Sequence, residues 1–348
     1  MANCNDLTDK MEKLVVEEKS NEKNWNNLPD EMKEMVVKEM PYDTRTRLKM
    51  CSKSDKYLVE SMKMNYDVLR ISAEKREENT LFNIILQMNN NPKLDFSLSM
   101  ASHTDDSEVA IVRNLGKVDE HIKQIACSSG KDGEMMMKRF FERVVFDRNL
   151  CFNCLNISGT YPGLLDGREF TLHPKLVKIK GMTGEVTGWL RNMAPGVEDL
   201  KLEKDDGDFD ETIDGLGTIP AVMNADMLVI EIPCDIDDDQ FANFKCTVAS
   251  FRGKSNVTGK GINQFIKKVI ANDYRACLEI VLNEVEVQTW NDIIEGLDVK
   301  VRLSHDEPED EQGQVKFGYR EGCIQMNQGK RMKILVANED KSVIMIPS

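Results

Sequence analysis

CLNIS at residues 154–158 and LVKIK at 176–180 begin a series that continues with DLKLE (199–203), MLVIE (227–231), VASFR (248–252) and CLEIV (277–281). Apolar and polar residues alternate in these segments, as in a strand that buries one face. The aligned apolar positions are separated by 22, 23, 28, 21 and 29 residues; they are Ile157, Ile179, Leu202, Ile230, Phe251 and Ile280. This nearly regular spacing predicts six strands that lie side by side.

The intervals also indicate what connects the strands. Units of about 20–29 residues are typical of leucine-rich-repeat-like β–α arrays, in which each unit packs on its neighbour. Apolar residues at helical spacing fill two intervals, at 186–193 and 262–270, whereas 213–223 and 237–244 carry a weaker pattern. The asparagine ladder of standard leucine-rich repeats is missing, so an ordinary doubly wound sheet stays open as the alternative.

Antiparallel strands are predicted on both sides of this array. Residues 66–132 contain strand-like runs separated by polar turns, and we interpret them as a β connector. A helix is predicted at about 133–147, and the runs after Leu297 read as a C-terminal β-meander that caps the sheet. The expected fold class is therefore α+β, with the α/β array and its meander at 133–348.

The N-terminal part of the chain has a different pattern. Residues 1–23 are polar and charged, and we expect a flexible tail. Residues 24–65 predict three short helices, the first at about 29–40, where Pro29 suits the first turn and Pro41 ends the helix. Asp43 and Ser54 are the expected N-caps of the second and third helices.

The composition excludes several classes of partner. The 46 basic and 60 acidic residues give a net charge of −14, and without a basic stripe we expect no nucleic-acid partner. No run approaches the roughly 18 consecutive apolar residues of a membrane-spanning helix, so we expect no membrane partner. Nine dispersed cysteines are typical of a chain that keeps its thiols reduced. The expected location is the cytoplasm, with the nucleus as a further compartment.

Motifs that carry chemistry are incomplete in this sequence. Cys151 and Cys154 form a Cys-x-x-Cys pair, but no second pair follows at zinc-site spacing, so we expect no metal. The stretch FRGKSN lacks the earlier glycine of a phosphate-binding loop, and the acidic stretch at 205–217 lacks the glycine and glutamate of a calcium loop. We therefore expect no cofactor and no enzymatic activity, although an unrecognised α/β enzyme stays open.

Residues 25–64 resemble an F-box. The resemblance rests on Trp25, the LPDEM stretch at 28–32, the apolar-periodic helix, Arg45 to Leu48, and CSKSD at 51–55. Ser54 stands where many other F-boxes carry a tryptophan. The likeness is greatest to the large nematode families that join an F-box to an F-box-associated C-terminal region, to which GINQFIKKVI (261–270) and IIEGLDVKVRL (293–303) bear a looser likeness.

This resemblance implies a non-catalytic substrate receptor of a cullin-RING (SCF-type) ubiquitin ligase. The F-box at 24–65 would bind a Skp-type linker, and through it cullin, while 133–348 would bind the protein to be ubiquitinated. The residues implied in linker binding are Leu28, Pro29, Met32, Val36, Met40, Leu48 and Cys51. Three short helices bury little surface among themselves, which agrees with a partner covering these side chains. Two alternatives stay open: a helical cap on the β region, and an interaction solenoid with a degenerate F-box.

Acidic residues follow two of the predicted strands. Because the carboxyl ends of parallel strands meet at one edge, the loops after DLKLE and MLVIE are expected to make that edge negative. The tentative substrate-binding residues are Asp206, Asp208, Asp237, Asp238 and Asp239. They would attract a target segment that bears lysine or arginine, unless they are solvated loops that keep the protein soluble.

Overall fold

The structure is a computed structural model that describes residues 25–347 apart from 41, 77–78, 89–94, 103–106, 114–120, 128–129, 147–149, 160–164, 166–169, 182–184, 205–210, 274, 308–315, 327–329 and 338–340. The flexible tail expected at 1–23 lies outside these residues. The chain divides into two compact units, Met1–Met62 and Lys63–Ser348.

The first unit consists of short helices around a small core. A 3-10 turn, η1 (Trp25–Asn27), precedes α2 (Asp30–Lys38), α3 (Tyr42–Leu48) and α4 (Lys53–Ser61). Val37, Val59 and Met62 are buried, with partly buried apolar side chains packed against them. Because only a few side chains close this core, much of each helix surface faces outward.

The helix starts correct two sequence-based expectations. Ser52, not Ser54, caps α4: its hydroxyl accepts a hydrogen bond from the Asp55 N–H at 3.0 Å. An N-cap side chain accepts a hydrogen bond from a free N–H of the first helical turn. Ser54 cannot do this because it lies inside the helix. Asp43 also lies inside its helix, which begins at Tyr42. Pro29 is the N-cap of α2, with extended backbone, and the helix begins at Asp30.

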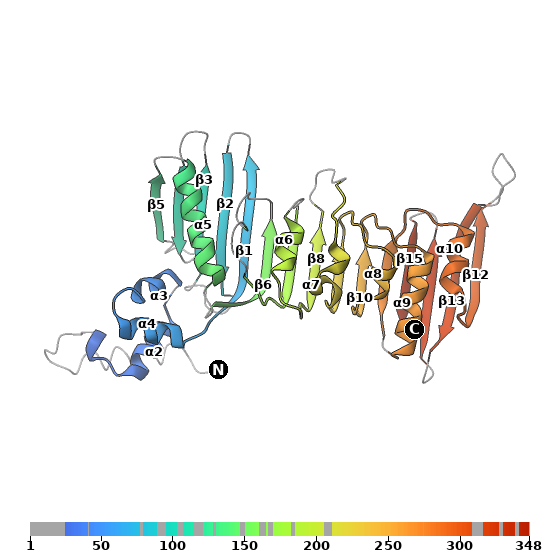
Figure 1. Ribbon diagram of the computed structural model, residues 1–348, viewed down its shortest axis with the longest axis horizontal. Helices are drawn as coiled ribbons and strands as arrows, with labels where there is room; N and C mark the ends of the chain where they lie inside the picture. Colours follow the sequence, from blue (N-terminus) through green and yellow to red (C-terminus); the bar gives the residue numbers. More distant parts are fainter. Residues whose placement is uncertain are drawn as a thin grey trace. The chain divides into compact units, whose positions relative to one another are not determined.

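The strands of the second unit form one sheet of fifteen in the described part of the chain (Figure 1). Its order is β12-β13-β14-β15-β11-β10-β9-β8-β7-β6-β1-β2-β3-β4-β5. Pairing is parallel from β1 through β6 to β11 and antiparallel on either side. The bounds are β1 (Met64–Arg76), β2 (Asn79–Gln87), β3 (Phe96–Ser102), β4 (Ser107–Arg113), β5 (His121–Cys127), β6 (Leu150–Ser158), β7 (Leu176–Lys180), β8 (Asp199–Glu203), β9 (Met227–Ile230), β10 (Val248–Phe251), β11 (Cys277–Val281), β12 (Val299–Glu307), β13 (Lys316–Gln325), β14 (Arg331–Ala337) and β15 (Ser342–Pro347).

The six strands expected from the repeated pattern are present, and the residues used to align them are register partners. Ile157 pairs with Ile179, and the row continues through the neighbouring strands to Ile280. All six side chains of this row are buried. Alternation thus directs one apolar side chain of each strand into a continuous core. The row extends to β1, where Ile71 pairs with Ile157.

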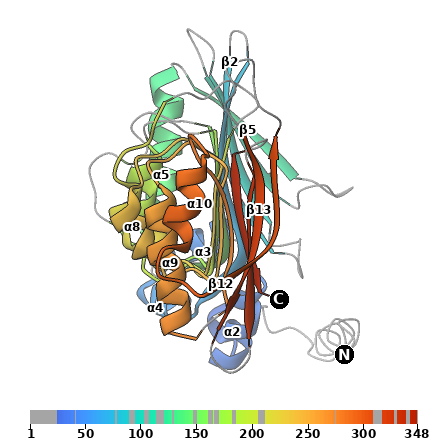
Figure 2. The same cartoon turned by 90° about the vertical axis from the view of Figure 1, so that its right-hand side faces the viewer.

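Helices cover one face of the sheet, as Figure 2 shows for α5, α8, α9 and α10. The bounds are α5 (Gly130–Phe146), α6 (Val186–Arg191), η3 (Leu216–Thr218), α7 (Pro220–Met223), α8 (Asp238–Ala242), α9 (Gly259–Ala271) and α10 (Val287–Ile294). The stripe predicted around Trp189 is buried on α6, and the stripe around Phe265 is buried on α9. The prediction of a mixed α+β fold with N-terminal helices and a large sheet is confirmed.

Candidate protein-interaction surface of the N-terminal helices

The scaffold of the first unit is tied together by the carboxylate of Asp55. The indole N–H of Trp25 donates to its Oδ1 at 2.6 Å, and the hydroxyl of Ser52 donates to its Oδ2 at 2.7 Å. These two bonds connect the segment before α2 to the start of α4. The hydrogen bond from Ser52, then that from Trp25, holds the pKa of Asp55 below its usual value, with a smaller contribution from Lys33.

The end of α2 is held by a buried arginine. The guanidinium of Arg45 donates to the carbonyl of Lys38 at 3.1 Å and to the carbonyl of Met40 at 3.3 Å. Cations favour the negative end of a helix, and donors there satisfy carbonyls that have no partner within the helix. Arg45 therefore connects α3 to the end of α2.

Three of the predicted linker-binding residues share one face of α2. Pro29, Met32 and Val36 follow one another at intervals of three and four residues, so their side chains line up along the helix. Pro29 is exposed, Met32 is 37% exposed and Val36 is half-buried. Leu28 is half-buried just before the helix, and its N–H donates to the Trp25 carbonyl at 3.2 Å. The structure thus brings these four residues together on an accessible apolar surface, named here the α2 face.

The other three predicted linker-binding residues have different surroundings. Met40 and Leu48 pack, partly buried, against the core formed by Val37, Val59 and Met62. Cys51 is exposed in the turn between α3 and α4. Replacing Met40 or Leu48 would therefore disturb the unit itself, whereas the α2 face and Cys51 can be altered from the outside.

Apolar residues that sequence reasoning did not include are also exposed on this unit. Met35 is 49% exposed, Met50 is 76% exposed and Tyr57 is 78% exposed. Large apolar side chains this accessible on so small a unit are typical of a surface that a partner covers. The sequence indicates such exposed residues, because it holds more apolar residues than three short helices can bury. The spacing of these residues alone does not tell which side chains face outward and which form the core.

The tentative substrate-binding residues of the second unit fall into three groups. Asp206 and Asp208 lie outside the described residues. Asp237 is the N-cap of α8, and Asp238 accepts bonds from the N–H and hydroxyl of Thr258, both at 2.6 Å. Asp239 is exposed in the first turn of α8. Asp237 and Asp238 therefore hold local structure, and Asp239 is the acidic side chain of this loop that can be altered with least effect on the fold.

The described residues hold no arrangement typical of a metal site or a reactive thiol. No group of three or more histidine, cysteine, aspartate or glutamate side chains there is arranged to hold a metal ion. Burial raises the pKa of the Cys234 thiol to about 11 and that of Cys246 to about 12, so both are protonated and unreactive at neutral pH. Within the same part of the chain, no helix has both the length and the apolar character needed to cross a bilayer.

Comparison with known proteins identifies the first unit. Residues 25–66 match the family model of the F-box domain, which covers η1, α2, α3, α4 and the first residues of β1. No curated protein and no solved structure matches the chain. The match supports the F-box resemblance of the N-terminal helices, and F-box domains generally bind the Skp-type linker of SCF ubiquitin ligases.

Proposed function

We propose that this chain is a substrate-recognition subunit of an SCF-type cullin-RING ubiquitin ligase. Its F-box domain binds a Skp-type linker, and the linker connects the chain to cullin. The second unit binds the protein to be ubiquitinated. The receptor itself forms and breaks no bonds, and it works in the cytoplasm or the nucleus.

One observation carries this proposal: the F-box match coincides with the accessible apolar α2 face. Central apolar anchors of protein interfaces commonly contribute about 2 kcal/mol or more each. The α2 face offers four such side chains, Leu28, Pro29, Met32 and Val36, on a scaffold that Asp55 and Arg45 hold in place. Met35, Met50 and Tyr57 supply further apolar area on the same unit.

The finer assignment of the second unit is also a proposal. We infer a nematode-type F-box protein whose residues 133–348 form a leucine-rich-repeat-like, F-box-associated region. Six parallel strands in a single register support this inference, because each repeat of such an array packs only on its neighbours. Of the two likeness segments, 261–270 lies in α9, and 293–303 runs from the end of α10 into β12.

The acidic edge stays a proposed route for target capture. Asp239 and Glu211 are exposed, and both follow strands of the parallel array. Such a rim attracts a basic segment over about 8 Å at physiological ionic strength. Asp239→Lys should slow association with a basic target, whereas substitution of Asp237 or Asp238 would also disturb α8.

Affinity purification of the tagged full-length chain, with mass spectrometry scoring of linker and cullin peptides, tests the proposal. Both proteins should co-purify with the wild-type chain. The interaction solenoid with a degenerate F-box predicts that neither is enriched over an unrelated tagged protein. That result would remove the ligase assignment while leaving the second unit free to bind proteins in another role.

A further inference from the structure

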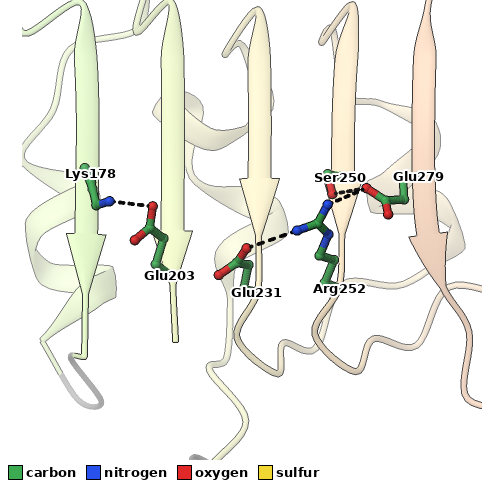
Figure 3. Close-up of polar contacts among 6 residues, drawn as sticks. All are labelled: Lys178, Glu203, Glu231, Ser250, Arg252 and Glu279. Carbon is green, nitrogen blue, oxygen red and sulfur yellow. Dashed lines mark hydrogen bonds and ion pairs between the residues drawn. The ribbon is translucent and has the colours of Figure 1, made fainter. Parts of the chain in front are cut away.

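Among the described residues, no helix covers one face of the parallel strands of the second unit. In Figure 3, six polar side chains rise from β7 to β11 on one side, while the helices lie behind the strands. Parallel sheets are usually covered on both faces, since their strands bury apolar side chains on each side. The outer face of β1 and β6–β11, named here the open face, is therefore a candidate contact surface.

An apolar row crosses the open face near the start of the strands. Cys154 is the register partner of Leu176, which pairs with Asp199, and the row continues through Met227 and Val248. Leu176 is 42% exposed and Met227 is 36% exposed. The carboxylate of Asp199 interrupts the row, and its Oδ1 is buried without a hydrogen-bond partner among the described residues. A partner on this row would bury apolar area that now faces outward.

A basic row lies two residues further along the same strands. Arg70 on β1 pairs with Asn156 on β6, and the row continues to Lys178 on β7 and Lys201 on β8. Lys178 and Lys201 are direct register partners, and like charges in that position destabilise a sheet. Lys178 contacts Glu203 at 2.7 Å, as Figure 3 shows, and Lys201 contacts Asp199 at 3.4 Å.

The two halves of the open face differ in charge. On β1 and β6–β8, three rows of outward positions are compared: the apolar row, the basic row, and the row two residues beyond the basic row. These positions hold four basic side chains (Arg70, Lys178, Lys180 and Lys201) against two acidic ones (Asp199 and Glu203), which leaves +2. Glu74 lies beyond these rows on β1. Just after β10, Arg252 contacts Glu231 at 3.6 Å and Glu279 at 3.1 Å, so that half is neutral to acidic (Figure 3).

We propose that the half of the open face on β1 and β6–β8 binds a segment of a target protein. This segment carries both acidic and apolar side chains. Carboxylates of the segment lie on the basic row, and its apolar side chains lie on the apolar row, about 7 Å away. A net positive patch on a chain of charge −14 favours this chemistry. Two aromatic residues share the register of this face, Tyr66 on β1 and Phe152 on β6, and both are buried. Neither ring is accessible for a nucleic-acid base to stack on, which favours a protein partner.

This inference rests on the proposed receptor function, and its test uses defined probes. Three labelled twelve-residue peptides, in which Leu alternates with Glu, Lys or Gln, are titrated into the full-length chain at several salt concentrations. The Glu peptide should bind at least about tenfold tighter than the neutral Gln peptide, and added salt should reduce that advantage. Binding of the Lys peptide reports on the acidic rim. A twelve-residue oligothymidine serves as the nucleic-acid probe.

Matched variants locate the binding site. Lys178→Glu with Lys201→Glu should weaken binding of the Glu peptide about tenfold, and Lys178→Met with Lys201→Met about threefold without adding acid beside Glu203. Lys260→Glu with Lys267→Glu, both exposed on α9, is the control and should change affinity less than about twofold.

Several outcomes would overturn the inference. They are no binding of the Glu peptide, equal or tighter binding of the Gln peptide, tighter binding of the oligothymidine, and an equal loss in the α9 control. Binding of the Skp-type linker is measured on the same samples. If the wild-type chain binds linker but does not bind the Glu peptide, the open-face inference is wrong and the receptor function stands. If the wild-type chain does not bind linker, the receptor function is wrong.

Discussion

At the scale of single residues, Asp55 shows how a small helical unit keeps its shape with few buried apolar side chains. Its carboxylate accepts hydrogen bonds from Trp25 and Ser52, and its N–H bonds back to the Ser52 hydroxyl. Hydrogen bonds to a charged group are stronger than neutral ones. The position of η1, and with it that of Leu28 and Pro29, therefore depends on one ionised side chain.

Asp55→Asn should destabilise the first unit by about 1–2 kcal/mol, because an amide replaces the charged acceptor. Urea unfolding followed through the Trp25 indole N–H signal, assigned with Trp25→Phe, measures the loss. Asp30→Asn is the matched control. The Asp30 carboxylate is exposed, and its Oδ1 lies 3.6 Å from the Lys33 ammonium in an i,i+3 surface ion pair, which contributes little to stability. An equal loss in both variants would contradict the role given to Asp55.

The same contacts predict a pH dependence. The pKa of Asp55 is lower in the folded unit than its usual 3.8, so its contribution is complete above the unfolded-state pKa. The contribution is lost as the pH falls through the folded-state pKa. The stability difference between wild type and Asp55→Asn should therefore stay constant from pH 7 to pH 5 and shrink below about pH 4. A difference that grows on acidification would be inconsistent with this sign.

At the scale of elements, the strands of the array could be predicted because each carries its own alternating pattern. Val177 and Ile179 of β7, for example, are buried while Lys178 between them is exposed. α10 was not predicted, although its apolar residues Val287, Trp290, Ile293 and Ile294 stand three or four residues apart or side by side. Eight residues give only about two helical turns, which is too short a stretch to establish a helical period.

The pairing of strands that are distant in the sequence could also not be predicted from the apolar pattern. β1 lies beside β6 in parallel, although four antiparallel strands and α5 separate them along the chain. Alternation tells which face of a strand is buried, and it says nothing about which strand is its neighbour. The α2 face was anticipated through the F-box resemblance, whereas Met35, Met50 and Tyr57 needed the structure to reveal their exposure.

Contacts between neighbouring helices of the array lead to a further prediction. The ammonium group of Lys268 on α9 donates to the carbonyl of Ala242, the last residue of α8, at 3.0 Å and to the carbonyl of Phe244, two residues later, at 2.9 Å. Lys268→Met should cost about 2 kcal/mol and lower the midpoint of thermal unfolding of the second unit by roughly 4 °C.

Lys267→Met serves as the control for this effect, because Lys267 is exposed on the same helix. Circular dichroism during heating measures both variants. A midpoint lowered equally by the two substitutions would show that Lys268 does not hold α8 through its carbonyls. A midpoint lowered by more than the expected amount would indicate that the contacts between α8 and α9 also depend on Lys268. These contacts include the rings of Phe241 and Phe265, whose centroids are 5.2 Å apart.

At the scale of the whole molecule, the chain combines two units with different kinds of surface. Met1–Met62 has a small core and exposed apolar helix surface, and Lys63–Ser348 has a continuous core below an open, charged sheet face. The proposed receptor role requires such a division, because one surface must be shared with the linker and another must be particular to the target. We therefore expect that each surface can be altered without changing the other.

The central claim, that the F-box domain binds a Skp-type linker through the α2 face, is tested most directly by the affinity of the full-length chain for purified linker. Isothermal titration should give one linker per wild-type chain, and Leu28→Ala with Pro29→Ala should weaken binding about a thousandfold, since two central anchors of about 2 kcal/mol each are lost. Leu176→Ala with Pro195→Ala, an exposed Leu and Pro pair on the second unit, should bind linker as wild type does. Wild-type affinity in the Leu28→Ala, Pro29→Ala variant would contradict the claim.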